Sequence, residues 1–203
     1  MTKTQLQISK ICLSSLFLAL GWLMPFITGQ IQQIGSMFLP MHFPILLAGF
    51  ILGPWYGLLL GFITPITRSL IFGMPPLFPT SISMAFELAT YGFVAGFLFQ
   101  LIYRKFNKIN IYFNIYISLI SSLILGRVIY AIVMSILMLI SSKITFNWSI
   151  FINGVLLNAW PGILIQLFLI PSIIIFLYKA KILQKYIYQK GNVEGINVSE
   201  LTK

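Results

Sequence analysis

Three charged residues lie inside long apolar runs of the sequence: Arg68, Glu87 and Arg127. A charge in the hydrocarbon of a membrane costs free energy unless it is paired or faces a cavity, so such residues indicate functional sites. Two guanidinium groups opposed by one carboxylate favour an anionic or zwitterionic ligand, because arginine binds carboxylates through charge-assisted hydrogen bonds. Two other interpretations stay open. Glu87 and Arg127 could neutralise each other as a structural ion pair, and Arg68 could extend to the outer lipid headgroups.

Polar and aromatic residues recur beside these charges at helical spacing. Glu87 shares a helical face with Tyr91, and Arg127 shares one with Tyr130. Together with the loops on the outer side, these faces can enclose a pocket that opens to the outside, in which aromatic rings could stack on a planar ligand. The candidate substrate-binding residues are Arg68, Phe78, Glu87, Tyr91, Arg127, Tyr130, Asn158 and Trp160.

The composition indicates an integral membrane protein and excludes several chemistries. The chain has 203 residues, of which 59% are hydrophobic and 8% charged, against roughly 25% charged residues in soluble proteins. Its three acidic residues are Glu87, Glu194 and Glu200, so the membrane-embedded part holds one carboxylate, too few for two-carboxylate catalysis. One His and one Cys cannot build a metal cage, and no Walker-type phosphate loop occurs. We therefore expect neither an enzyme nor a bound cofactor.

Six apolar segments are candidate membrane spans, and together they predict an all-α bundle of transmembrane helices. A bilayer core of about 30 Å requires about 20 residues per helix. The second segment is short, and it could instead form a re-entrant hairpin with the third. Residues 1–190 are expected to form one membrane domain, and residues 191–203 a flexible cytoplasmic tail. The expected spans are residues 9–28, 39–53, 55–72, 80–103, 111–140 and 148–178.

The distribution of Lys and Arg predicts that both termini are cytoplasmic. Basic residues prefer short cytoplasmic loops. With six spans and an internal N-terminus, the basic residues near the N-terminus, in the loop after Tyr103 and after Tyr178 are all inside, and Lys143 alone is in an external loop. The formal net charge of +10 is explained by this topology, because the sequence shows no basic groove or stacking platform for nucleic acid.

Small residues predict close helix contacts, because backbones approach each other in lipid where side chains are small. The pairs Gly57 and Gly61, and Gly92 and Gly96, are expected to pack spans within the protein. Ser15 and Ala19 on the first span could instead dock a partner helix. His42, beside Pro44 at an outer helix start, is expected to be interfacial rather than ligand-binding.

Four stretches of the sequence resemble a known family. They are LPMHFPILLAGFILGPWYG from Leu39, GFITP from Gly61, GMPPLFPT from Gly73 and FELATYG from Phe86. These stretches resemble the substrate-binding S components of energy-coupling factor (ECF) vitamin transporters. The resemblance covers roughly residues 9 to 180.

The resemblance implies a multi-pass protein of the bacterial plasma membrane that captures a micronutrient from outside. It implies three partners, a transmembrane coupling subunit and two cytoplasmic ATPase subunits, with Ser15 and Ala19 docking the coupling subunit. For the substrate, the Glu87 segment resembles pantothenate-type S components, with riboflavin, folate or another micronutrient as alternatives. A proton-coupled secondary transporter that uses Glu87 as proton carrier is the alternative from another class.

Overall fold

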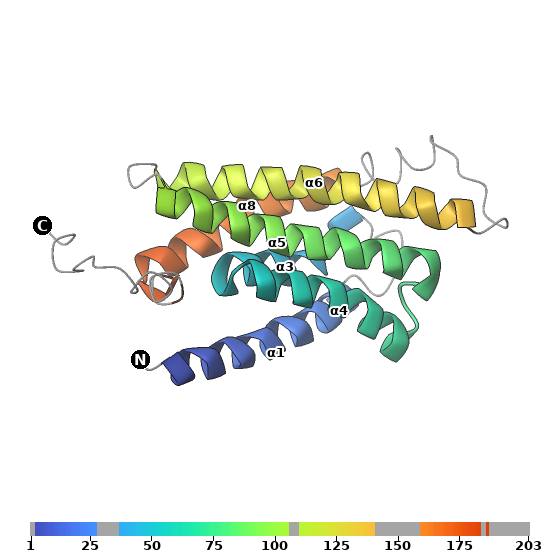
Figure 1. The fold of residues 1–203 in the computed structure, drawn as a ribbon, viewed down its shortest axis with the longest axis horizontal. Coiled ribbons are helices and arrows are strands. Elements are labelled where there is room, and N and C mark those ends of the chain that lie inside the picture. Colours follow the sequence, from blue (N-terminus) through green and yellow to red (C-terminus); the bar gives the residue numbers. More distant parts are fainter. Residues whose placement is uncertain (1–2, 28–36, 106–109, 141–158, 184–185, 187–203) are drawn as a thin grey trace, which may run out of the picture.

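The computed structural model describes residues 3–27, 37–105, 110–140, 159–183 and 186, and all regular secondary structure within these ranges is helical (Figure 1). Asn110 precedes the helix that starts at Ile111, and its side chain accepts a hydrogen bond from the backbone N–H of Tyr112 in the first turn at 3.1 Å. The elements are α1 (Lys3–Ile27), α3 (His42–Leu52), α4 (Pro54–Phe72), the π-helical turn η1 (Leu77–Ser81), α5 (Ile82–Lys105), α6 (Ile111–Ile140) and α8 (Trp160–Lys179).

Helix length and composition agree with a membrane bundle. Within the described residues, five helices are long and apolar enough to cross a bilayer: Thr4–Ile27, Pro54–Phe72, Leu77–Lys105, Ile111–Ile140 and Trp160–Lys179. The helix α3 falls in the second expected span, residues 39–53, but its 11 residues extend only about 16 Å at 1.5 Å per residue. The six crossings and the cytoplasmic termini stay predictions.

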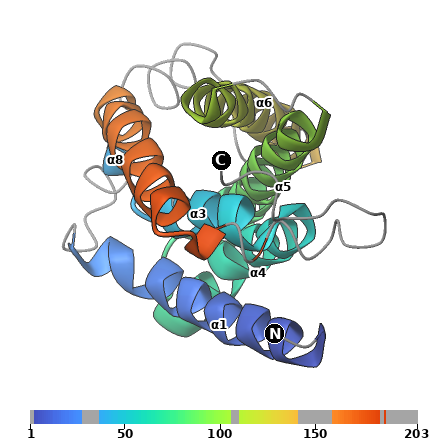
Figure 2. The same ribbon diagram turned by 90° about the vertical axis from the view of Figure 1, so that its left-hand side faces the viewer.

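The short helix α3 forms the centre of the bundle. Ten of its 11 residues are buried, and it packs against α1, α4, α5 and α8 (Figure 2). A helix that is apolar on all sides requires such an enclosed position. Gly53 ends the helix with φ of 102°, a conformation that favours glycine, and Pro54 then starts α4, where a missing N–H does no harm.

The glycine pairs confirm the predicted close packing inside the protein. Gly57 on α4 and Gly92 on α5 are so close that a Cβ added to either would collide with the backbone of the other. Gly61 likewise lies against the backbone of Leu88, and Gly96 against that of Gly49. The small residues therefore bring α3, α4 and α5 into direct backbone contact.

Polar contacts hold α6 against α5, while its outer face is apolar. The amide of Asn114 donates to the backbone carbonyl of Phe99 at 3.1 Å, and Ser118 donates to Asn114 at 3.2 Å. On the other side of α6, Ile124, Val128, Ile132 and Ile136 are exposed, as expected of a surface that faces lipid.

Candidate functional site

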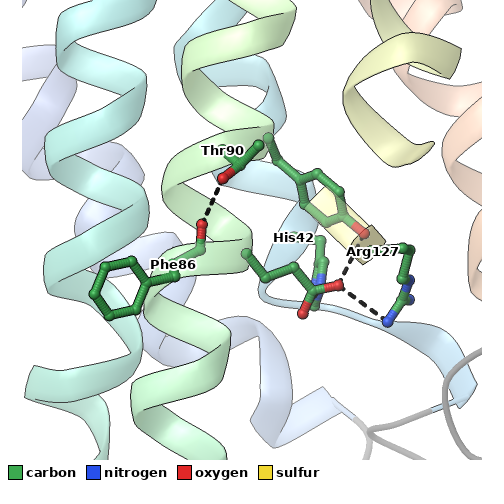
Figure 3. A network of polar contacts seen from close by, with 6 residues as sticks. His42, Phe86, Thr90 and Arg127 are labelled. Atoms are coloured by element: carbon green, nitrogen blue, oxygen red, sulfur yellow. Dashed lines mark hydrogen bonds and ion pairs between the residues drawn. The ribbon is translucent and has the colours of Figure 1, made fainter. Parts of the chain in front are cut away.

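A buried polar cluster surrounds the carboxylate of Glu87, which projects from α5 and is 1% exposed as a residue. One carboxylate oxygen accepts a hydrogen bond from the hydroxyl of Tyr91 at 2.9 Å and pairs with Arg127 Nη1 on α6 at 3.0 Å. The other oxygen lies 3.6 Å from His42 Nε2, at the start of α3. Figure 3 shows His42 and Arg127 around this carboxylate. The cluster thus joins three helices at one anion.

The sequence positions this cluster through helical spacing and one glycine. Glu87 and Tyr91 are four residues apart, so their side chains meet on one face of α5. The ring of Tyr91 occupies the place that a Cβ on Gly126 would fill, which lets α6 approach and brings the next residue, Arg127, to the carboxylate. The ring of His42 lies 5.3 Å from that of Tyr91, centroid to centroid. The face of α5 that carries Glu87 and Tyr91 thus contacts both neighbouring helices, α3 and α6.

Several buried polar atoms of the cluster have no hydrogen-bond partner among the described residues. They include Arg127 Nε and Nη2 and His42 Nδ1. A guanidinium presents five N–H donors in a planar fork, and Glu87 engages Nη1. The nitrogens Nε and Nη2 form the side-on edge of that fork, which matches the two oxygens of a carboxylate. The arrangement is therefore suited to bind an anion in addition to Glu87.

Gln166 on α8 is a further buried polar group, with 0% of its surface exposed. Neither polar atom of its amide has a hydrogen-bond partner within the part of the chain that the structure describes. Gly162, one turn earlier, lies against the backbone of Met37 and Phe38, shortly before α3. Since residues four apart share a helix face, Gln166 is on the side of α8 that faces α3.

The other predicted aromatic residues have different environments. Tyr130 is partly buried on α6, one turn after Arg127. Phe78 in η1 is 44% exposed and Trp160 at the start of α8 is 59% exposed. Among the described residues, no hydrogen bond, ion pair or ring contact joins Phe78 or Trp160 to the Glu87 cluster. Asn158 lies outside the described residues.

Arg68 occupies a separate site between α1 and α4. It is 3% exposed, its Nε donates to the carbonyl of Trp22 at 3.4 Å, and its Nη1 donates to the carbonyl of Met74. The guanidinium also lies 5.8 Å from the ring centroids of both Phe26 and Phe72. The alternative in which Arg68 extends to lipid headgroups is wrong, because its donors hold the end of α1 to the loop after α4.

His42 is the functional candidate that the sequence interpretation missed. It was expected at the membrane interface, but it is 1% exposed and lies against Glu87 and Tyr91. The physical reason is that α3 is enclosed by other helices, so its first turn is inside the bundle. The uninterrupted apolar character of residues 43–52 was the available signal for this burial.

The predicted docking residues lie on α1, whose outer surface is largely open. Ser15 is exposed and donates to the carbonyl of Ile11 at 3.2 Å, whereas Ala19 is partly buried. Ile8, Ile11 and Leu23 of the same helix are more than half exposed.

In the part of the chain with described coordinates, no group of three or more His, Cys, Asp or Glu residues could hold a metal ion.

A family model described as "ECF transporter, substrate-specific component" matches residues 9–178 of the chain. No curated protein and no solved structure matches the chain significantly. The matched segment includes the whole Glu87 cluster. It also includes the helices from α1 to α8 given above, except for the first residues of α1 and the last residue of α8.

Proposed function

The chain belongs to the family of ECF transporter substrate-specific components, and on this basis we propose that it captures a carboxylate-bearing vitamin or vitamin precursor from outside the cell, with pantothenate as the best assignment. Membership in the family makes the protein the substrate-specific subunit of an importer rather than an enzyme. It also implies a transmembrane coupling subunit and ATPases as partners. Within this frame, the Glu87 cluster is the proposed binding site.

The observation that carries the substrate assignment is the side-on edge of Arg127. Its Nε and Nη2 are buried and have no partner among the described residues, while Nη1 binds Glu87 at 3.0 Å. A buried donor without a partner costs about 1–3 kcal/mol, and more when it is charged. A structural ion pair therefore accounts for one nitrogen of Arg127, and a substrate carboxylate would satisfy the other two.

Other buried polar groups of the bundle suit the rest of such a substrate. Pantothenate carries hydroxyl and amide groups beside its carboxylate, and it needs neutral donors and acceptors as well as a cation. His42 and the amide of Gln166 have buried polar atoms that no described residue satisfies. Riboflavin, folate or another micronutrient remain the alternatives. The ring system of riboflavin or folate would stack on Phe78 and Trp160, whose side chains are exposed.

The orientation of the protein follows from its basic residues. The start of α1, the end of α5 and the end of α8 lie at one end of the bundle (Figure 1), and they carry Lys10, Arg104, Lys105 and Lys179. The positive-inside rule assigns this end to the cytoplasm of the bacterial plasma membrane. The proposed docking surface for the coupling subunit is the face of α1 with Ser15 and Ala19.

Arginine-to-lysine exchange tests the binding site, with the second buried arginine as the matched control. Arg127→Lys keeps the charge but removes the planar fork, so the dissociation constant for pantothenate should rise about 10- to 150-fold, as expected for the loss of about 1.5–3 kcal/mol. Arg68→Lys should leave the affinity nearly unchanged, because Arg68 binds backbone carbonyls of its own chain. Equal affinities of wild-type protein and Arg127→Lys, measured by calorimetry, would refute the assignment.

A proton-coupled secondary transporter is the competing function from another class. Its supporting observation is the buried Glu87 carboxylate between Tyr91 and His42, which resembles a short proton path. Uptake that continues without the ATPase subunits and stops with an uncoupler would favour this alternative. Uptake that stops when the ATPase subunits are removed would favour the ECF importer.

A further inference from the structure

A second polar site lies at the opposite end of the bundle from the expected substrate entrance. A cavity of about 50 Å³ is lined by residues of α1, of the turn between α3 and α4, of α5 and of the segment after α8. The polar and aromatic members of its lining are Lys10, Trp55, Tyr56, Gln100, Arg104 and Tyr186. None of these residues belongs to the proposed substrate-binding site.

The charges around the cavity are positive. Lys10 and Arg104 bring two cations from different helices to one small space. Glu87 is the only acidic residue in the described part of the chain, and it is 17 positions from Arg104 on the same helix, about 25 Å along the axis at 1.5 Å per residue. An anion that neutralises this cavity therefore comes from outside the described residues.

The first turn of α4 provides backbone donors at the same place. Trp55 and Tyr56 belong to the first turn of α4, which starts at Pro54, and the N–H groups of a first helical turn have no acceptor within the helix. The end of α3 (Leu52 and Gly53) lines the cavity too, so the dipoles of α3 and α4 oppose each other there, and the backbone N–H groups of α4 are the feature that suits an anion. On the other side of the cavity, Lys10 is held in place by the carbonyl of Leu52 at 3.5 Å and by the ring of Tyr56 at 5.7 Å from its centroid.

The surface next to the cavity is apolar and exposed. Trp55, which lines the cavity, is 63% exposed and packs edge-to-face on Phe93 at 5.6 Å. Exposed apolar residues continue from it along α4 with Leu59 and along α5 with Phe97 and Leu101. A ligand that fits both features has an anionic head and hydrocarbon chains. Free phosphate would use only the first feature.

We propose that this cavity binds the phosphate group of an anionic phospholipid, with the acyl chains along the outer face of α4 and α5. Lys10 and Arg104 neutralise the phosphate, Gln100 supplies a neutral hydrogen-bonding group, and Trp55 marks the level of the headgroups, where tryptophan is enriched. Basic pockets between transmembrane helices on the cytoplasmic side bind such headgroups in membrane proteins generally. The cytoplasmic side of this site rests on the positive-inside rule.

Native mass spectrometry of the detergent-purified full chain tests the proposal with adjacent basic residues as a matched pair. The protein is titrated in three arms with phosphatidylglycerol, phosphatidylcholine or sodium phosphate. Arg104→Gln removes a cavity cation, whereas Lys105→Gln removes the same charge from a residue that does not line the cavity. We expect one tightly retained phosphatidylglycerol, about fivefold weaker binding in Arg104→Gln, and unchanged binding in Lys105→Gln. Arg104→Lys should retain most of the affinity.

Four results would overturn the proposal. Equal losses in Arg104→Gln and Lys105→Gln would mean that the lipid responds to the overall positive charge rather than to the cavity. Equal retention of phosphatidylcholine and phosphatidylglycerol would exclude recognition of an anionic head. Sodium phosphate that displaces the lipid from the wild-type protein at low millimolar concentration would assign the cavity to free phosphate. Undiminished lipid binding in Arg104→Gln would show that the lipid binds outside the cavity.

Discussion

Glu87→Gln should destabilise the protein strongly, because it leaves the guanidinium of Arg127 buried without an anion. The two side chains are 3.0 Å apart, with 2% of Glu87 and 13% of Arg127 exposed. Removal of one partner from a buried ion pair costs about 3–5 kcal/mol. For a chain of this length, about 2–4 °C are lost per kcal/mol, so the midpoint of thermal unfolding should fall by about 6–20 °C. The hydrogen bond from Tyr91 persists, because the amide oxygen of Gln still accepts it.

The double variant Glu87→Gln/Arg127→Gln separates the ion pair from simple loss of packing. Each single change leaves one uncompensated charge, whereas the double change leaves none. The double variant should therefore be more stable than the sum of the two single effects predicts, by about 2 kcal/mol or more. The double variant combines the side-chain volume changes of the two single variants, so the loss of packing alone would give additive effects on the free energy of unfolding.

Thermal unfolding in detergent, followed by circular dichroism without added ligand, measures this coupling. Thr90→Val is the matched control, because Thr90 is on α5 near Glu87 but donates to the carbonyl of Phe86 at 2.8 Å (Figure 3). It should change the midpoint by about 2–4 °C at most, equivalent to about 1 kcal/mol. Additive effects of Glu87→Gln and Arg127→Gln would refute the interpretation of the cluster as a coupled unit.

Two further predictions concern packing and partner docking. Gly92→Ala should destabilise the bundle by about 1–3 kcal/mol, because the new methyl group meets the backbone of Gly57. The control Gly73→Ala should cost only about 1 kcal/mol, because its methyl group meets no atom within 4 Å and only the φ of 71° opposes the change. Equal midpoints of thermal unfolding for the two variants would contradict the close packing of α4 on α5. Ala19→Trp should abolish uptake and leave substrate binding intact, whereas Val128→Trp on the exposed face of α6 should preserve both; normal uptake by Ala19→Trp would remove the docking role.

The sequence predicted the local parts of the site, because these depend on helical spacing. Glu87 and Tyr91 were expected on one face of a helix, and they are hydrogen-bonded at 2.9 Å. The pairing of Glu87 with Arg127 was one of two open interpretations, and the structure contains that pair. Whether Arg127 also binds substrate stays a prediction, since one guanidinium can do both.

The rest of the site depended on which helices are neighbours, which spacing within one helix does not determine. His42 reaches Glu87 because α3 lies inside the bundle against α5, whereas a helix start next to a proline suggested an interfacial position. Arg68 was expected in the pocket because of its charge, but the approach of α1 directs its donors to the carbonyl of Trp22. Both differences arise from tertiary packing of helices that are distant in the sequence.

Mass spectrometry of the small molecules released from the denatured, detergent-purified protein tests the central claim most directly. A substrate-binding subunit with a carboxylate site at Arg127 should release one stoichiometric vitamin or precursor that carries a carboxylate, and Arg127→Ala, purified in the same way and folded, should release none. A stoichiometric ligand without an anionic group, or equal retention of the ligand by folded Arg127→Ala, would contradict the account.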